Sequence, residues 1–196
     1  MSFLEKGYKV PTDTNYLNKL PQGETNFRVL SSAIVGYEYW TQDNKPVRSR
    51  EIFKKRPADV KIEKDGTWKQ HHFWAFVVWH YEDSRVKIME VTQKTIMNPI
   101  KSYVDNVKWG DPKDYDITIV REGDGLKTEY AVMPNPKSEL ELKIAVEVSK
   151  KKVNLEALFS GEDPFEESEE AETVDTHEST MTQEEQNELL SGIEVE

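Results

Sequence analysis

The sequence predicts a mainly β fold: a small barrel of about five strands followed by a disordered acidic C-terminal tail. Two observations lead to this fold class. Aromatic and β-branched residues form short runs separated by turn-forming residues, a pattern typical of strands. The charge is also split, since residues 161–196 contain 14 acidic residues and neither Lys nor Arg.

This split changes how the net charge of −11 is interpreted. The chain has 37 acidic and 26 basic residues, so residues 1–160 hold 23 acidic residues against 26 basic ones, a net charge of about +3. The tail is rich in Glu, Ser and Thr, and it has too few apolar residues to offset the entropic cost of ordering. We therefore expect a flexible N-terminal arm (residues 1–15), a folded domain (residues 16–160) and a disordered acidic tail (residues 161–196).

The sequence of the first half of the domain predicts one long strand and a hairpin. Residues 26–40 form the long strand, in which the alternating apolar residues share one face. These residues are Phe27, Val29, Val35, Tyr37 and Tyr39. Gly36 inside this strand indicates a bulge or a sharp bend. Residues 72–81 and 85–91 are two further strands that turn at Asp83 and Ser84.

The second half predicts a helix, a second hairpin and a C-terminal helix. Residues 92–107 have helical spacing, with Asn98 as N-cap and Pro99 at the first helical position. Strands over 115–121 and 127–133 flank a glycine turn, and the sheet closes at residues 134–136.

A Ser138–Glu141 capping box predicts a helix over residues 139–151, although alternating apolar residues leave a strand open there. Asn154 caps a last short turn. The resulting order, strand, hairpin, helix, hairpin, is that of an OB-fold, which has five strands and a helix between the third and fourth. Other small β-barrels with one helix remain open.

A basic loop is the first candidate site. Residues 45–56 contain six cationic side chains and one acidic side chain, that of Glu51. Cations on an irregular loop beside a sheet suit phosphate binding. The six cations are Lys45, Arg48, Arg50, Lys54, Lys55 and Arg56. The alternative is an ordinary solvated loop.

The aromatic strand over residues 72–81 is the second candidate. A small barrel has one interior, so Trp74 and Phe76 on an outward face would be available to stack on bases. With the turn at Asp83, Lys87 lies opposite His80 on this same face, which adds a cation. The alternative is that these aromatic residues belong to the core.

Several classes of function are excluded. The chain has no Cys, which excludes disulfides, cysteine-ligated zinc and a catalytic thiol, and which suits a reducing cytoplasm. No run of apolar residues is long enough for a membrane span, and the N-terminus lacks the apolar region of a signal peptide. His71, His72 and His80 are expected at the surface, and the alternative is that His72 and His80 contact phosphate.

Catalytic motifs are equally missing. Asp114 and Asp116 share a strand face, but their spacing to other acids does not support a metal-dependent nuclease. There is no phosphate-binding glycine loop and no Ser-His-Asp pattern. We expect no enzyme, no metal site and no cofactor.

The tail ends in an acidic segment with apolar residues. Leu189, Leu190 and Ile193 lie among glutamates, and segments of this kind often bind partner proteins. The alternative is a tail that only keeps the protein in solution.

Three segments carry a family resemblance, over residues 16–165. They are HFWAFVVWHYEDSRVKIMEVTQKTI, DPKDYDITIVREGDGLKTEYAVMPNP and VNLEALFSGEDPF. They resemble bacteriophage-encoded single-stranded-DNA-binding proteins. The resemblance implies an OB-fold, binding of single strands with little sequence preference, and an acidic tail that recruits partners and restrains binding. It also implies a role in phage DNA replication, recombination and repair in the host cytoplasm.

Two hypotheses follow. In the first, the protein binds single-stranded DNA without being an enzyme, and its tail meets replication or recombination proteins. In the second, it is a protein-interaction module whose acidic tail imitates nucleic acid. A homo-oligomer is compatible with both.

Overall fold

The computed structural model describes residues 15–165, which form one open, mixed β-sheet with few helices. The strands are β1 (Tyr16–Leu17), β2 (Gly23–Val29), β3 (Ile34–Trp40), β4 (Pro46–Ser49), β5 (His71–His80), β6 (Arg85–Val91), β7 (Tyr115–Glu122) and β8 (Glu129–Lys137). The helices are α1 (Lys94–Val104), α2 (Leu142–Ser149) and α3 (Ala157–Ser160), with 3-10 turns η1 (Pro112–Asp114) and η2 (Gly125–Lys127). The predicted mainly β class is confirmed.

The strand order is consistent with an OB-like fold. The central part of the sheet runs β6-β5-β2-β7-β8, and α1 lies in sequence between β6 and β7. Within residues 15–165 the sheet has eight strands and ends at β1, at β8 and, on the branch through β3, at β4, so the predicted count of about five strands and the closed barrel are not seen.

The predicted long strand over residues 26–40 is two strands, β2 and β3, separated by a bend at residues 30–33. Both strands pair with β5: β2 pairs with its second half and β3 with its first half. The bend is fixed because Ser31 Oγ accepts a hydrogen bond of 2.9 Å from the Val77 amide. Val35, which the sequence placed on the same strand face as Phe27 and Val29, is 44% exposed, whereas those two side chains are buried.

Gly36 is not the bend that the sequence suggested, because it lies inside β3. A Cβ at this position would lie 2.6 Å from the Ser49 carbonyl oxygen and 2.9 Å from the Phe159 ring. Glycine therefore allows β4 and α3 to approach β3 closely.

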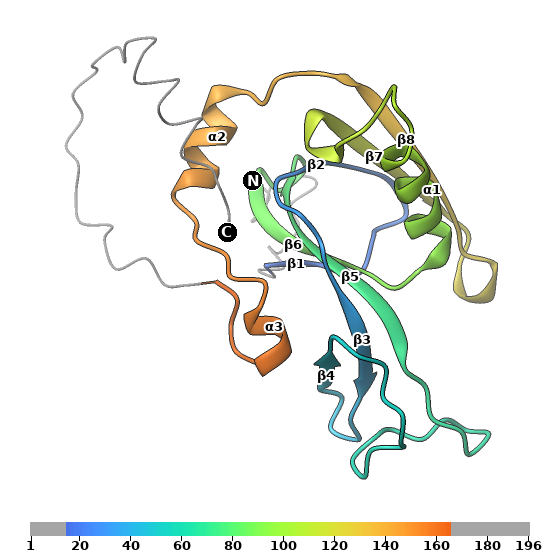
Figure 1. Ribbon diagram of the computed structural model, residues 1–196. Helices are drawn as coiled ribbons and strands as arrows, with labels where there is room; N and C mark the ends of the chain where they lie inside the picture. Colours follow the sequence, from blue (N-terminus) through green and yellow to red (C-terminus); the bar gives the residue numbers. More distant parts are fainter. Residues whose placement is uncertain (1–14, 166–196) are drawn as a thin grey trace, which may run out of the picture.

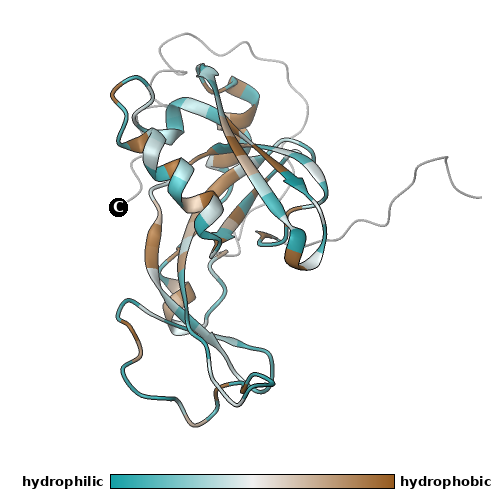
Figure 2. Ribbon diagram, turned by 90° about the vertical axis from the view of Figure 1, so that its right-hand side faces the viewer, coloured by the Kyte–Doolittle hydropathy of each residue, from teal (hydrophilic) through white to brown (hydrophobic). Residues whose placement is uncertain are grey.

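A projecting finger is the most distinctive part of the shape. We use this name for residues 34–75, which comprise β3, β4, a long loop and the first half of β5. Figure 1 shows it extending away from the rest of the sheet. Its loop is mostly hydrophilic, as the colouring of Figure 2 shows.

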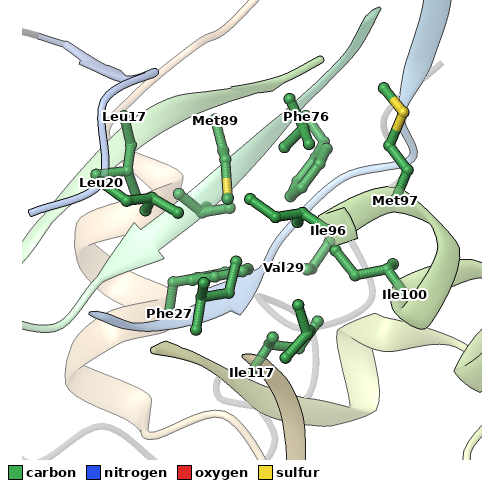
Figure 3. Packing of buried hydrophobic residues seen from close by; sticks show 14 of the residues in the cluster. Leu17, Leu20, Phe27, Val29, Phe76, Met89, Ile96, Met97, Ile100 and Ile117 are labelled. Atoms are coloured by element: carbon green, nitrogen blue, oxygen red, sulfur yellow. The ribbon is translucent and has the colours of Figure 1, made fainter. Parts of the chain in front are cut away.

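The first hydrophobic core lies between the sheet and α1. Figure 3 shows Ile96 and Ile100 pointing toward Phe76 and Val29. The helix begins at Lys94, with Gln93 as N-cap and Pro99 inside it, so the predicted start at Asn98 is wrong. The earlier start is favourable because it brings Ile96 into the core at 1% exposure.

The second core lies on the opposite face of β5 and β6. Phe73, Val77 and Ile88 pack there against residues of the C-terminal segment, namely Ile144, Leu155 and Leu158. β5 is therefore buried on both faces, which explains why its sequence is apolar on both. The prediction that Trp74 and Phe76 point outward is wrong, because both side chains face the first core. The C-terminal segment covers the other face of β5.

The C-terminal segment agrees with the sequence in part. The predicted helix exists as α2, but Glu141 is its N-cap without a side-chain hydrogen bond, so the capping box is wrong. Ser138 Oγ instead accepts a hydrogen bond of 2.7 Å from Arg28. Asn154 Oδ1 accepts from the Glu156 amide at 3.1 Å, as a turn cap should.

β8 continues through Pro134 and Pro136, where the sequence predicted the sheet to close. Prolines are tolerated there because β8 is an edge strand, and an edge strand has one side on which backbone donors are not needed.

Most of the predicted N-terminal arm and acidic tail, including Leu189, Leu190 and Ile193, lies outside the described residues. No helix in residues 15–165 is long and apolar enough to cross a membrane.

Candidate nucleic-acid interface

An apolar groove of about 500 Å³ opens between the bend, β5 and α1. We call it the first groove. Its apolar lining includes Val35, Trp74, Phe76 and Val104. Trp74 is half-buried, whereas Phe76 is only 3% exposed. The structure thus places both predicted stacking residues at this groove, but only the Trp74 ring is accessible, because Phe76 is buried in the first core.

Flat side chains continue from this groove along one face of the finger. Val35 pairs with Trp74 across β3 and β5, and two residues further along each strand Tyr37 pairs with His72. The Tyr37 and His72 ring centroids are 5.2 Å apart. Because side chains alternate in a strand, these residues share one face.

The row ends beside the basic loop. Tyr39 lies two residues beyond Tyr37, and its ring contacts Phe53 edge-on with centroids 4.9 Å apart. Tyr37 and Phe53 were not among the predicted site residues, and His72 was considered only as a contact for phosphate. Alternation with Trp74 along β5 places His72 on this face, but Tyr37 joins it through the register of β3 with β5. Phe53 comes from an irregular loop whose fold the sequence does not reveal.

Five of the six predicted phosphate-binding cations are exposed on the finger, and four of these five form no ion pair within residues 15–165. Lys45 lies in the β3–β4 turn, and Lys54, Lys55 and Arg56 follow β4. Within residues 15–165 none of these four side chains has an ion pair in the structure, which leaves them available to an anion.

Arg50 is also exposed, but it already has partners. It forms an ion pair with Glu156, and both side chains are more than half exposed. Its guanidinium lies 4.9 Å from the centroid of the Phe159 ring. Exposed pairs of this kind are weak, so a phosphate can replace Glu156.

Arg48 does not belong to this exposed set, and the prediction that it contacts phosphate does not fit its burial and its ion pairs. Its Nη2 donates to Glu90 at 2.6 Å, and its Nε lies 3.3 Å from Glu38. All three side chains are largely buried. Burial raises the pKa of both Glu38 and Glu90, although Arg48 opposes the shift in each.

His80 and Lys87, like Arg48, have structural roles. The register places His80 opposite Arg85 and Lys87 opposite Val78, so the predicted pairing of His80 with Lys87 is wrong. Both side chains are buried and share Asp83, to which His80 Nδ1 lies at 2.8 Å. Hydrogen bonding from Lys87 lowers the pKa of Asp83, so that carboxylate stays charged and pairs with both side chains, while the buried His80 Nε2 has no hydrogen-bond partner among the described residues.

The candidate carboxylates are separated and paired. Asp116 accepts hydrogen bonds from Arg28 at 2.5 Å and Tyr81 at 2.9 Å, while Asp114 pairs with Lys137. Burial, followed by the bond to Asp116, raises the pKa of Tyr81 to about 12. In the described part of the chain no group of three or more His, Asp or Glu side chains is arranged to hold a metal ion.

Comparisons with known proteins give one informative similarity. The chain is 27% identical over 149 residues to the "Probable ssDNA-binding protein" of Escherichia phage T5. The aligned region covers 64% of this chain and 57% of the phage protein, so the chain spans less than two thirds of that relative's length. No family model and no solved structure matches the chain.

Proposed function

We propose that this protein binds single-stranded DNA with little dependence on sequence. The observation that carries the proposal is the finger, where a row of flat side chains leads from Trp74 to the loop that holds Lys54, Lys55 and Arg56. Bases stack on flat rings irrespective of their identity, and cations neutralise the phosphates. The similarity to the phage protein supports the same function.

The binding mode follows from the exposure of each group. Trp74 at the first groove stacks on a base, with Tyr37 and His72 as the next platforms along the finger. Lys45, Lys54, Lys55 and Arg56 bind the backbone, and Arg50 joins them when it leaves Glu156.

In a phage setting, such binding protects single strands during DNA replication, recombination and repair in the host cytoplasm. Leu189, Leu190 and Ile193 of the acidic tail recruit replication or recombination proteins. These roles extend the proposal beyond the DNA contact itself, and they depend on it.

A fluorescence titration tests the proposal. Poly-dT added at low salt should quench the tryptophan emission, and log K should fall by about 0.7 per log unit of salt for each neutralised phosphate. Absence of quenching, together with no change in the anisotropy of a labelled strand, would exclude DNA binding.

Repeating the titration after removal of residues 166–196 separates the two hypotheses. A protein-interaction module whose tail imitates nucleic acid binds no DNA in either form. A DNA-binding protein binds in at least the shortened form.

A further inference from the structure

A second groove, of about 820 Å³, lies on the other side of the β2–β3 bend. One wall is the bend itself, and the other is the C-terminal segment from Val148 to Glu156. In Figure 1 the chain from β2 to β3 passes between α1 on one side and the segment leading to α3 on the other.

The two grooves meet at the bend. Ser31, Ser32, Ala33 and Lys113 line both of them. The first three have small side chains, so little material separates the grooves. The bend is also held in place, because the Leu30 amide donates to the Val77 carbonyl oxygen at 2.9 Å and Ser31 Oγ accepts from the Val77 amide.

The linings of the two grooves differ in chemistry. The first groove is apolar and contains the Trp74 ring. The second mixes apolar walls with Lys113, Lys151 and Asn154. Its one acid, Glu156, is outnumbered by the two lysines, so the lining of the groove carries an excess of positive charge.

Both lysines are placed to meet a phosphate. The backbone of Lys113 is anchored by Arg28, whose Nη1 donates to the Lys113 carbonyl oxygen at 3.3 Å. The Lys113 ammonium lies 3.6 Å from Asp111, and both side chains are about half exposed. Such an exposed ion pair is weak, so a phosphate can replace Asp111. Lys151 is exposed and has no ion pair within residues 15–165 in the structure.

We propose that single-stranded DNA crosses the Ser31–Ala33 bend and occupies both grooves. Bases enter the first groove against Trp74, and the backbone continues through the second groove along Lys113 and Lys151. The C-terminal segment is then part of the DNA site as well as a cover for the second core. This inference rests on the proposed function and extends its path.

Strand length tests the inference in the full-length protein. Oligo-dT of about 4 nucleotides fills the first groove, whereas about 16 nucleotides reach the second, and this range matches the site sizes of OB-folds. Lys151→Glu should weaken binding of the long strand roughly threefold to tenfold and lower its salt slope by about 0.7 or more. Binding of the short strand should change by less than about twofold.

Lys150→Glu is the matched control. Lys150 is the neighbouring lysine, it does not line the groove, and its ammonium lies 2.7 Å from Glu147. Equal effects of the two variants on the long strand, or no effect of Lys151→Glu, would overturn the second groove as a DNA path. Failure of the unaltered protein to bind either strand would instead overturn the proposed function.

Discussion

Val35 and Trp74 face each other across β3 and β5, at the point where the finger joins the first groove. Val35 is 44% exposed, whereas Trp74 is half-buried and also packs against the first core. The ring is thus fixed by the core on one side and reachable from the groove on the other. A stacking platform requires this combination, because a fixed ring loses little conformational entropy when a base binds.

Trp74→Ala should weaken binding of oligo-dT by about 5- to 150-fold, since stacking on an aromatic ring contributes about 1–3 kcal/mol per base. Trp74→Phe keeps a flat ring and should retain most of the affinity. Trp40→Ala is the control, because Trp40 is exposed but lies on the other face of the finger. Anisotropy of a labelled strand measures all three, and a loss in the control as large as in Trp74→Ala would contradict the assigned face.

Replacing both Lys54 and Lys55 with Ala should reduce the salt dependence of binding. Two lost phosphate contacts lower the slope of log K against log salt by about 1.4. The pair Lys143→Ala and Lys150→Ala removes the same charge from α2 and its C-cap, and it should leave the slope unchanged. An unchanged slope in the finger variant would remove these lysines from the interface.

Glu90→Gln should stabilise the fold near pH 7. The pKa of Glu90 is raised in the folded protein because burial disfavours its charge, so the folded state binds more protons than the unfolded state above about pH 4.5. Stability therefore rises as the pH falls from neutral through the raised pKa. Gln mimics the protonated form, so its advantage should shrink over the same interval.

Urea unfolding followed by tryptophan fluorescence at pH 7 and pH 5 measures this difference. Arg48→Ala is the opposite case, since it leaves two buried carboxyl groups without a cation and should cost about 3–5 kcal/mol. A Glu90→Gln variant that is less stable at pH 7 than at pH 5, relative to the unaltered protein, would contradict the sign.

Removal of residues 166–196 should tighten DNA binding, and more at low salt than at high salt. This segment contains 12 acidic residues and no Lys or Arg, so its loss leaves 26 basic and 25 acidic residues. Repulsion between the segment and DNA is screened over about 10 Å at 0.1 M salt. Equal affinity of the two forms at low salt would show that the segment does not oppose binding.

The sequence predicts the local elements better than their partners. Residue alternation and turn signals place β5, β6 and their turn at Asp83 within one residue of the structure. The same pattern cannot distinguish one strand from two, because the break at residues 30–33 depends on β5 changing partners. It also cannot show that residues from Leu140 onward cover the outer face of β5.

The residues of the candidate site also differ in how far the sequence can predict them. Lys54, Lys55 and Arg56 are recognisable as a group because loop charges are contiguous in the chain. Arg48 looks identical in sequence, yet Glu38 and Glu90 reach it from β3 and β6, and these contacts are separated along the chain. Phe53 and Lys151 enter their surfaces only through the tertiary fold.

The prolines of β8 have a consequence for self-assembly. The open sheet ends at this strand, where Pro134 and Pro136 each remove a backbone donor. A second molecule cannot add a continuous strand along this stretch, because the hydrogen-bond ladder would be interrupted twice. The β8 end of the sheet is therefore protected from strand addition at these residues, so that neighbouring molecules cannot extend the sheet through them.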